Sequence, residues 1–184
     1  MANSLLFIHV PKTGGLSVNH FLRVGRGEVS KLSGPRHHAT AAEFLEHVGQ
    51  EAFDSATKFA VVRDPISRFL SACNHSRQVP NGPHIVRNIE SGVSVGLPSA
   101  LFQKQKDLLY IDGELAVDKL FRYEDDVPEA LYEWLIDQGF DAERQPKFPH
   151  VNRRRRRRPI ELTEMREKWV REYYACDYEA FGYE

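Results

Sequence analysis

The chain has 184 residues, of which 41% are hydrophobic and 28% charged, and its formal net charge is −1 at pH 7. This length and composition predict a single domain over residues 1–184 that buries a substantial core. A net charge so close to zero excludes a general attraction to nucleic acid or to a membrane surface, so any anion site has to be local. Two cysteines cannot form a disulfide framework. No cluster of residues has metal-ligand spacing, so no metal is expected. The apolar start is too short to span a bilayer, which favours a cytoplasmic protein.

The first stretch of the chain is a short apolar run followed at once by a glycine-bearing loop. Residues 5–10 (Leu-Leu-Phe-Ile-His-Val) are typical of a buried strand, and the apolar residues after Gly15 predict a helix. Free N–H groups and the positive end of the helix dipole converge at such a junction and attract an anion. Lys12 adds a mobile charge, and hydroxyl groups add donors. We therefore expect a loop that holds the 5′ phosphate end of a nucleotide, made of Lys12, Thr13, Gly14, Gly15, Leu16 and Ser17.

Two adjacent histidines, His37 and His38, stand just before a second predicted helix. Thr40 and Glu43 have the spacing of a capping box, so this helix should begin just after Thr40. A cation is disfavoured at a helix N-terminus, so one imidazole should stay neutral near pH 7, as a general base must be. From the residues alone, a pair of surface loop histidines remains the other interpretation.

A second strand–loop–helix unit begins with the apolar run at residues 59–62. Asp64 followed by Pro65 predicts a helix start, with a side-chain cap and then proline at the first helical position. Arg63 at the strand end and Ser71 two turns into the helix are placed to reach one anion between them, since a guanidinium group binds an anion in a bidentate manner. The other interpretation of Arg63 is an ion pair at the sheet edge. Arg68, in the same helix, is expected either to touch phosphate or to lie in solvent.

The remaining segments are less informative. Residues 74–98 are rich in proline and glycine and are expected to form a lid or an acceptor-binding loop. A strand is expected at 117–124 and a helix that Gly139 terminates. A last amphipathic helix is expected over 162–174, with an inward stripe of Leu162, Met165, Trp169, Val170 and Tyr173. The arginine run 153–158 has three open interpretations: a solvated loop, a nucleic-acid contact, or a contact with the anion site.

Two motifs resemble those of a known family. Pro-Lys-Thr-Gly-Gly-x-Ser at residues 11–17 resembles the 5′-phosphosulfate loop of sulfotransferases that use 3′-phosphoadenosine 5′-phosphosulfate (PAPS), and it is most similar to the carbohydrate sulfotransferase branch in a small bacterial-type form. Arg-Asp-Pro-x-x-Arg-x-x-Ser at residues 63–71 resembles the 3′-phosphate site of the same family. The two motifs in this order, about fifty residues apart, are more specific than either alone. A histidine before a Thr-Ala pair lies near the acceptor in this family, and it maps best to His38.

The resemblance implies both a fold and a reaction. The fold is α/β and three-layered, with a central parallel sheet flanked by helices and a likeness to P-loop NTPases; apolar strands that alternate with helices favour the same class. The reaction is transfer of a sulfuryl group from PAPS to an acceptor hydroxyl, such as that of a glycan or an anionic compound. The product is adenosine 3′,5′-bisphosphate. In this scheme Lys12 neutralises charge on the leaving oxygen and His38 removes the acceptor proton, without a metal.

A different class also stays open, namely a P-loop-like nucleotide-binding protein or kinase without sulfotransfer activity. The loop does not contain the Gly-x4-Gly-Lys-Ser/Thr string of nucleotide-triphosphate loops, because its lysine precedes its glycines. Neither a nucleic acid nor a membrane is expected as a partner, and the sequence does not predict the oligomeric state.

Overall fold

The computed structural model describes residues 4–24, 30–76, 100–125, 127–141 and 160–184. Its main sheet has four strands in the order β2–β1–β3–β6, and every neighbouring pair is parallel. These strands are β1 (Ser4–Ile8), β2 (Ser30–Lys31), β3 (Thr57–Val62) and β6 (Lys119–Arg122). A separate antiparallel pair consists of β4 (Tyr110–Ile111) and β5 (Glu114–Leu115). The strands expected near residues 5–10, 59–62 and 117–124 are therefore confirmed.

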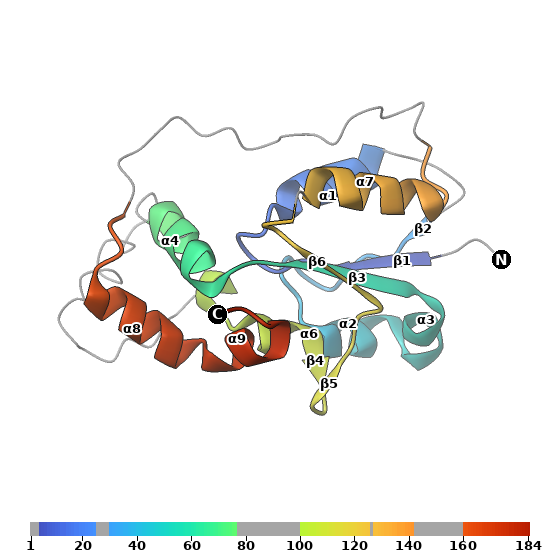
Figure 1. The fold of residues 1–184 in the computed structure, drawn as a ribbon. Helices are drawn as coiled ribbons and strands as arrows, with labels where there is room; N and C mark the ends of the chain where they lie inside the picture. The colour runs from blue at the N-terminus through green and yellow to red at the C-terminus, as the bar shows by residue number, and fades with distance from the viewer. Residues whose placement is uncertain (1–3, 25–29, 77–99, 126, 142–159) are drawn as a thin grey trace.

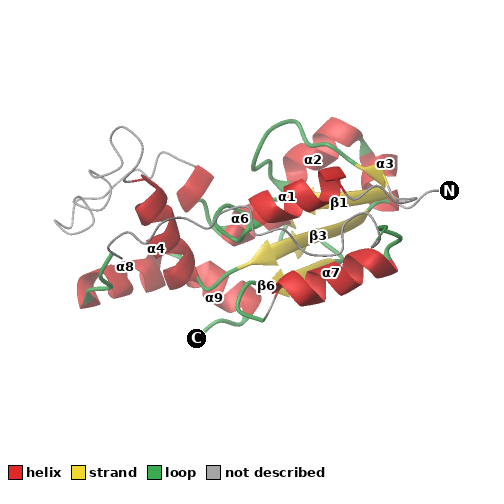
Figure 2. Ribbon diagram, turned by 90° about the horizontal axis from the view of Figure 1, so that it is seen from above, coloured by secondary structure: helices red, strands yellow, loops and turns green. Residues whose placement is uncertain are grey.

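Helices cover both faces of the sheet (Figures 1 and 2). On one face lie α1 (Gly15–Val24) and α7 (Val127–Asp137). On the other lie α2 (Ala41–Val48), α3 (Gln50–Ser55), α6 (Gln105–Leu109) and α9 (Ala175–Phe181). The predicted α/β class, with a parallel sheet between helical layers, is confirmed.

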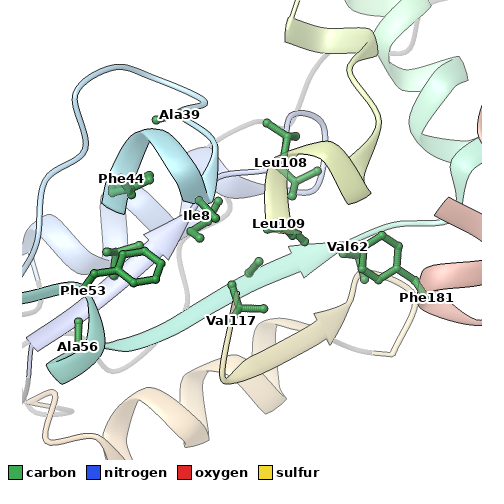
Figure 3. Packing of buried hydrophobic residues seen from close by; sticks show 14 residues of the cluster. Ile8, Ala39, Phe44, Phe53, Ala56, Val62, Leu108, Leu109, Val117 and Phe181 are labelled. Carbon is green, nitrogen blue, oxygen red and sulfur yellow. The ribbon is translucent and has the colours of Figure 1, made fainter. Parts of the chain in front are cut away.

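The alternation of side chains along the two central strands produces these two cores. Leu5 and Phe7 of β1 pack toward α1 and α7, whereas Leu6 and Ile8 pack toward α2 and α3. Figure 3 shows the second of these clusters, in which Ile8 lies near Phe44 of α2 and Val62 lies beside Phe181 of α9. Because both faces of these strands are buried, the strands have continuous apolar sequences rather than alternating ones.

A third hydrophobic cluster lies beyond the carboxyl ends of the strands, where α4 (Pro65–Ser76), the 3-10 helix η1 (Ala100–Phe102) and α8 (Glu164–Tyr173) pack together (Figure 1). The expected inward stripe of α8 is only partly right. Met165 is 57% exposed and Leu162 is 37% exposed, while Arg166 is buried and Val170 is fully buried. An aliphatic stem allows an arginine to take an apolar position, which a pattern of hydrophobic residues misses.

The predicted helix starts are confirmed in detail. Thr40 and Glu43 form both hydrogen bonds of the capping box at the start of α2. Asp64 Oδ1 accepts a hydrogen bond of 2.7 Å from the N–H of Ser67, and α4 begins at Pro65. Thr163 caps α8 in the same way, through the N–H of Arg166.

In the part of the chain that the structure describes, no helix has the length and apolarity needed to cross a membrane.

Candidate anion and transfer site

The candidate site lies at the carboxyl ends of β1 and β3, which are neighbours in the sheet. A parallel pair delivers both following loops to the same edge. These are the Lys12 loop (residues 11–17) and the Arg63 loop (residues 63–64). A cavity of about 320 Å³ opens there, and ten residues line it: His9, Lys12, Gly14, Gly15, Leu16, Ser17, His37, His38, His75 and Leu101. Six of the predicted site residues therefore share one cavity, and Thr13, Arg63 and Ser71 do not line it.

The backbone of the Lys12 loop takes a conformation that side chains disfavour. Lys12 has φ 69° and Gly14 has φ 82°. For a residue other than glycine, this left-handed region costs roughly 1–2 kcal/mol, and such strain gathers at functional sites. Among the described residues, the others with side chains and positive φ are His38 and Asp112, and Asp112 belongs to a tight turn next to Gly113. The two residues predicted to act in catalysis are thus both held in strained conformations.

The loop is also fixed from inside. The buried Thr13 hydroxyl donates a hydrogen bond of 2.8 Å to the carbonyl of Val10, so the structure places this hydroxyl within the loop rather than in the cavity. Gly15, the first residue of α1, lies against the ring of His9, because an added Cβ would come within 2.0 Å of that ring. Glycine at this position lets the helix N-terminus approach His9 closely, and the first N–H groups of a helix have no partner within the helix.

The ring of His38 has a defined orientation and tautomer. Its Nδ1 lies 3.0 Å from the carbonyl oxygen of His9, which can only accept, so Nδ1 carries the proton and Nε2 holds the lone pair. Arg36 donates to the His38 carbonyl while it pairs with both carboxylate oxygens of Glu43, which holds the strained residue in place. Burial lowers the pKa of His38 below its ordinary value of 6.5. The predicted neutral imidazole therefore has support, but its main cause is burial rather than the helix dipole.

His9 lies beneath His38, at the point where β1 runs into the loop, and is 6% exposed. Lys31 donates to Asn19 Oδ1 at 2.7 Å, so the amide of Asn19 turns its Nδ2 toward His9 Nδ1, at 3.4 Å. His9 Nδ1 is then an acceptor, and Nε2 carries the proton. Burial, together with the nearby His38, lowers the pKa of His9 from 6.5 to about 2. His9 is thus a neutral imidazole, held in place by Asn19 next to the ring of His38.

The histidine cluster (His9, His37 and His38) also has the dimensions of a metal site, since one nitrogen from each ring lies within 4.8 Å of the others. Three imidazoles suit zinc or copper. The hydrogen bond at His9 disfavours this use, although the donation from His38 Nδ1 to a carbonyl is compatible with it. A ligating histidine normally donates its second ring N–H to an acceptor, whereas His9 Nδ1 accepts from Asn19. The cluster suits a hydrogen-bonded support for His38 better than it suits a metal centre.

The Arg63 side chain reaches toward the Lys12 loop. Its Nη1 donates a hydrogen bond of 3.2 Å to the Lys12 carbonyl, and its guanidinium carbon lies 4.3 Å from the centre of the Tyr123 ring. Its Nε is buried and has no hydrogen-bond partner among the described residues. A buried unpaired donor on a cation fits an anionic ligand. Ser71 lies half-buried on α4, and no described contact joins it to Arg63.

The structure contradicts both interpretations that the sequence offered for Arg68. Arg68 is neither solvated nor directed at the cavity: it is 1% exposed and donates to the carbonyls of Leu101 and Gln103. Glu124, the last residue of the strand expected at 117–124, has a structural role, because it accepts from the N–H of Asp64 and from the Tyr183 hydroxyl. The expected lid falls mostly on 77–99 and the arginine run on 153–158, and both lie outside the described residues.

The sequence did not single out three residues that line the cavity, namely His9, His75 and Leu101. For two of these residues, His9 and His75, the sequence contains a pattern that could have identified them. His9 is a polar residue at the end of an apolar strand, two positions before Lys12, and His75 follows Ser67 and Ser71 at intervals of four residues on one helix face. A larger groove of about 700 Å³ runs along β6 and α7, but it contains none of the predicted site residues.

Two neighbouring strand–loop–helix units of this α/β protein each bring a cationic side chain to one sheet edge, an arrangement that suits an anionic ligand. Residues 2–91 match a protein-family model described as "Sulfotransferase family". This stretch contains β1 to α4 and both loops, and over it the chain is similar to the sulfotransferase family. The match confirms the resemblance at the level of the family and supports a transferase. Comparison with curated proteins and with solved structures gave no match.

The burial of His9 predicts a loss of stability in mild acid. The pKa of His9 is about 2 in the folded protein and 6.5 in the unfolded chain. Below pH 6.5 the unfolded chain therefore binds a proton at His9 that the folded protein does not bind. Lowering the pH from 7 to 5 should therefore reduce the free energy of unfolding by about 2 kcal/mol from His9 alone. Urea unfolding at both pH values measures this. The loss should shrink in His9→Gln and persist in His47→Gln, an exposed control; an equal loss in both variants would contradict the assignment.

Proposed function

We propose that the protein transfers a sulfuryl group from PAPS to an acceptor hydroxyl, on a sulfotransferase fold related to that of P-loop NTPases. The observation that carries the proposal is the hydrogen bond from Arg63 Nη1 to the Lys12 carbonyl. This bond joins the two loops directly, which supports the proposal that their cations bind the two ends of one small ligand. The resemblance of each loop to a phosphate site of PAPS-dependent sulfotransferases supports the choice of nucleotide.

The residues divide into donor-binding and acceptor-activating groups. Lys12, Gly14 to Ser17 and the α1 N-terminus bind the 5′ end and stabilise negative charge on the leaving oxygen, as in phosphoryl transfer, where positioning and electrostatics dominate. Thr13 belongs to the same 5′ loop through its backbone. Arg63, with Ser71 of the helix that follows it, is assigned to the 3′ phosphate end. PAPS supplies the sulfuryl group, and adenosine 3′,5′-bisphosphate is released.

His38 is assigned as the general base. Its Nε2 holds the lone pair, its ring lines the cavity with Lys12, and its pKa is lowered by burial, so it is neutral at physiological pH. His37 also lines the cavity, but His38 has the fixed tautomer. The acceptor is proposed to carry a hydroxyl group, with carbohydrates as the first class to test.

A transfer assay with radiolabelled PAPS and a panel of acceptors tests the activity directly. The panel should contain neutral sugars, uronic-acid glycans and small alcohols, and the expected result is label transfer to at least one hydroxyl acceptor. Calorimetry with adenosine 3′,5′-bisphosphate and with magnesium-ATP runs alongside it. Tighter binding of ATP, together with no transfer to any acceptor, would favour the kinase class instead.

Arg63→Ala tests the assignment of the second loop. A hydrogen bond to a charged group contributes about 1.5–3 kcal/mol, so the variant should bind adenosine 3′,5′-bisphosphate roughly tenfold to a hundredfold more weakly. Its affinity for adenosine 5′-phosphate should change little, because that ligand lacks the 3′ group. Calorimetry with both ligands measures the difference, and Arg23→Ala, an exposed arginine at the end of α1, is the control. Equal losses for the two ligands would assign Arg63 to structure.

A further inference from the structure

Gln105 pairs with the backbone of Arg63. Its side-chain Oε1 accepts from the Arg63 N–H at 2.9 Å, and its Nε2 donates to the Arg63 carbonyl at 2.8 Å. Gln105 is fully buried. A side-chain amide that pairs with both groups of one residue imitates a neighbouring strand.

The position of this contact in the sheet explains why it is needed. Val62 is the last residue of β3 and pairs with Arg122 of β6. The carbonyl of Val62 accepts the last of these interstrand bonds, from the N–H of Tyr123. Arg63 comes one residue later, where the ladder has ended and where α4 is about to begin. Gln105 supplies there the partner that a strand would have supplied.

Gln105 is itself held from the C-terminal helix. Asp177 of α9 is fully buried, and its two carboxylate oxygens accept from the N–H groups of Gln105 and Lys106, each at 2.9 Å. Arg68 of α4 lies 4.0 Å from the same carboxylate. A continuous series of contacts therefore runs from Asp177 through Gln105 to Arg63, and from the Arg63 guanidinium to the Lys12 carbonyl.

We propose that Gln105 is a positioning residue that fixes the Arg63 backbone and thereby aims the Arg63 guanidinium at the 3′ phosphate. This inference rests on the proposed function, because it takes the 3′ phosphate as the ligand of Arg63. Gln105 does not touch the ligand; it acts through Arg63. A rotation of the Arg63 peptide groups would move the guanidinium away from both the Lys12 carbonyl and the Tyr123 ring.

The test compares Gln105→Met, which keeps the side-chain length and removes both hydrogen bonds, with Gln105→Glu, which keeps only the acceptor. The readout is the ratio of the affinities for adenosine 3′,5′-bisphosphate and adenosine 5′-phosphate, measured by calorimetry. The ratio should fall at least tenfold in Gln105→Met and by about threefold to tenfold in Gln105→Glu. The affinity for adenosine 5′-phosphate should change less than threefold in both. In turnover, the KM for PAPS should rise more than kcat falls.

A matched control separates positioning from simple loss of stability. Leu131→Val removes one buried methylene group from α7, on the opposite face of the sheet, and should leave the affinity ratio at its wild-type value. A wild-type ratio in the Gln105 variants, combined with a lower Tm, would overturn the inference. If Gln105→Met does not fold, Gln105→Glu decides alone. A wild-type ratio in Arg63→Ala would instead remove the proposed 3′-phosphate site itself.

Discussion

Replacing Lys12 by glycine is expected to reduce sulfuryl transfer at least a hundredfold without weakening the fold. The lysine charge is assigned to the oxygen that leaves in the reaction, and removing one such group typically costs about 2.7–4 kcal/mol, or 10²–10³ in rate. Lys12 has φ 69°, a conformation that glycine adopts without strain. The variant should therefore unfold at the same temperature as the wild type or at a higher one, while turnover falls at least a hundredfold.

Lys12→Ala is the matched control for this result. Alanine also removes the charge but keeps the strain of a positive φ. The turnover of the alanine variant should therefore match that of the glycine variant, while its Tm should be lower than that of the glycine variant. Thermal unfolding and the transfer assay together measure both properties. Unchanged turnover in either variant would exclude Lys12 from the mechanism.

Replacing His38 by asparagine is expected to reduce turnover by about two to four powers of ten, which is the usual contribution of a general base. Asparagine tolerates the left-handed conformation that His38 adopts at φ 61°, so the loop should keep its shape. The affinity for adenosine 3′,5′-bisphosphate should stay within threefold of the wild-type value, because His38 is assigned to the acceptor. Single-turnover kinetics and calorimetry measure the two effects separately.

The neighbouring histidine and the pH profile provide the controls. His37→Asn should keep most of the activity; if it is the inactive variant instead, the base is His37. Because burial lowers the pKa of His38 below 6.5, the neutral form persists below that pH, and kcat should begin to fall only in more acidic solution. A decline that begins above pH 6.5 would contradict the buried environment of this imidazole.

Local patterns were sufficient to predict the framework of the site. The apolar runs that became β1 and β3, the capping box at Thr40 and the Asp64-Pro65 helix start each depend on a few adjacent residues, and the structure confirms all of them. The parallel sheet then follows, since strands that alternate with helices pair in this way. The placement of the two loops at one edge is a consequence of that topology.

The parts that sequence analysis missed depend on contacts between distant residues. Arg68 was expected on phosphate or in solvent, but the carbonyls of residues 101 and 103 and the carboxylate of Asp177 surround it. Nothing near Gln105 in the sequence indicates that its amide pairs with Arg63, 42 residues earlier. Likewise, the tautomer of His38 depends on the carbonyl of His9, 29 residues away. Such partners become visible only when the chain is folded.

The central claim is that the Lys12 loop and the Arg63 loop hold the two ends of one adenine nucleotide. A crystal structure of the protein with adenosine 3′,5′-bisphosphate tests it most directly. The account predicts that Lys12 and the loop N–H groups contact the 5′ phosphate of a nucleotide whose 3′ phosphate meets Arg63. A nucleotide bound elsewhere, or one whose two phosphates contact only one of these loops, would contradict it.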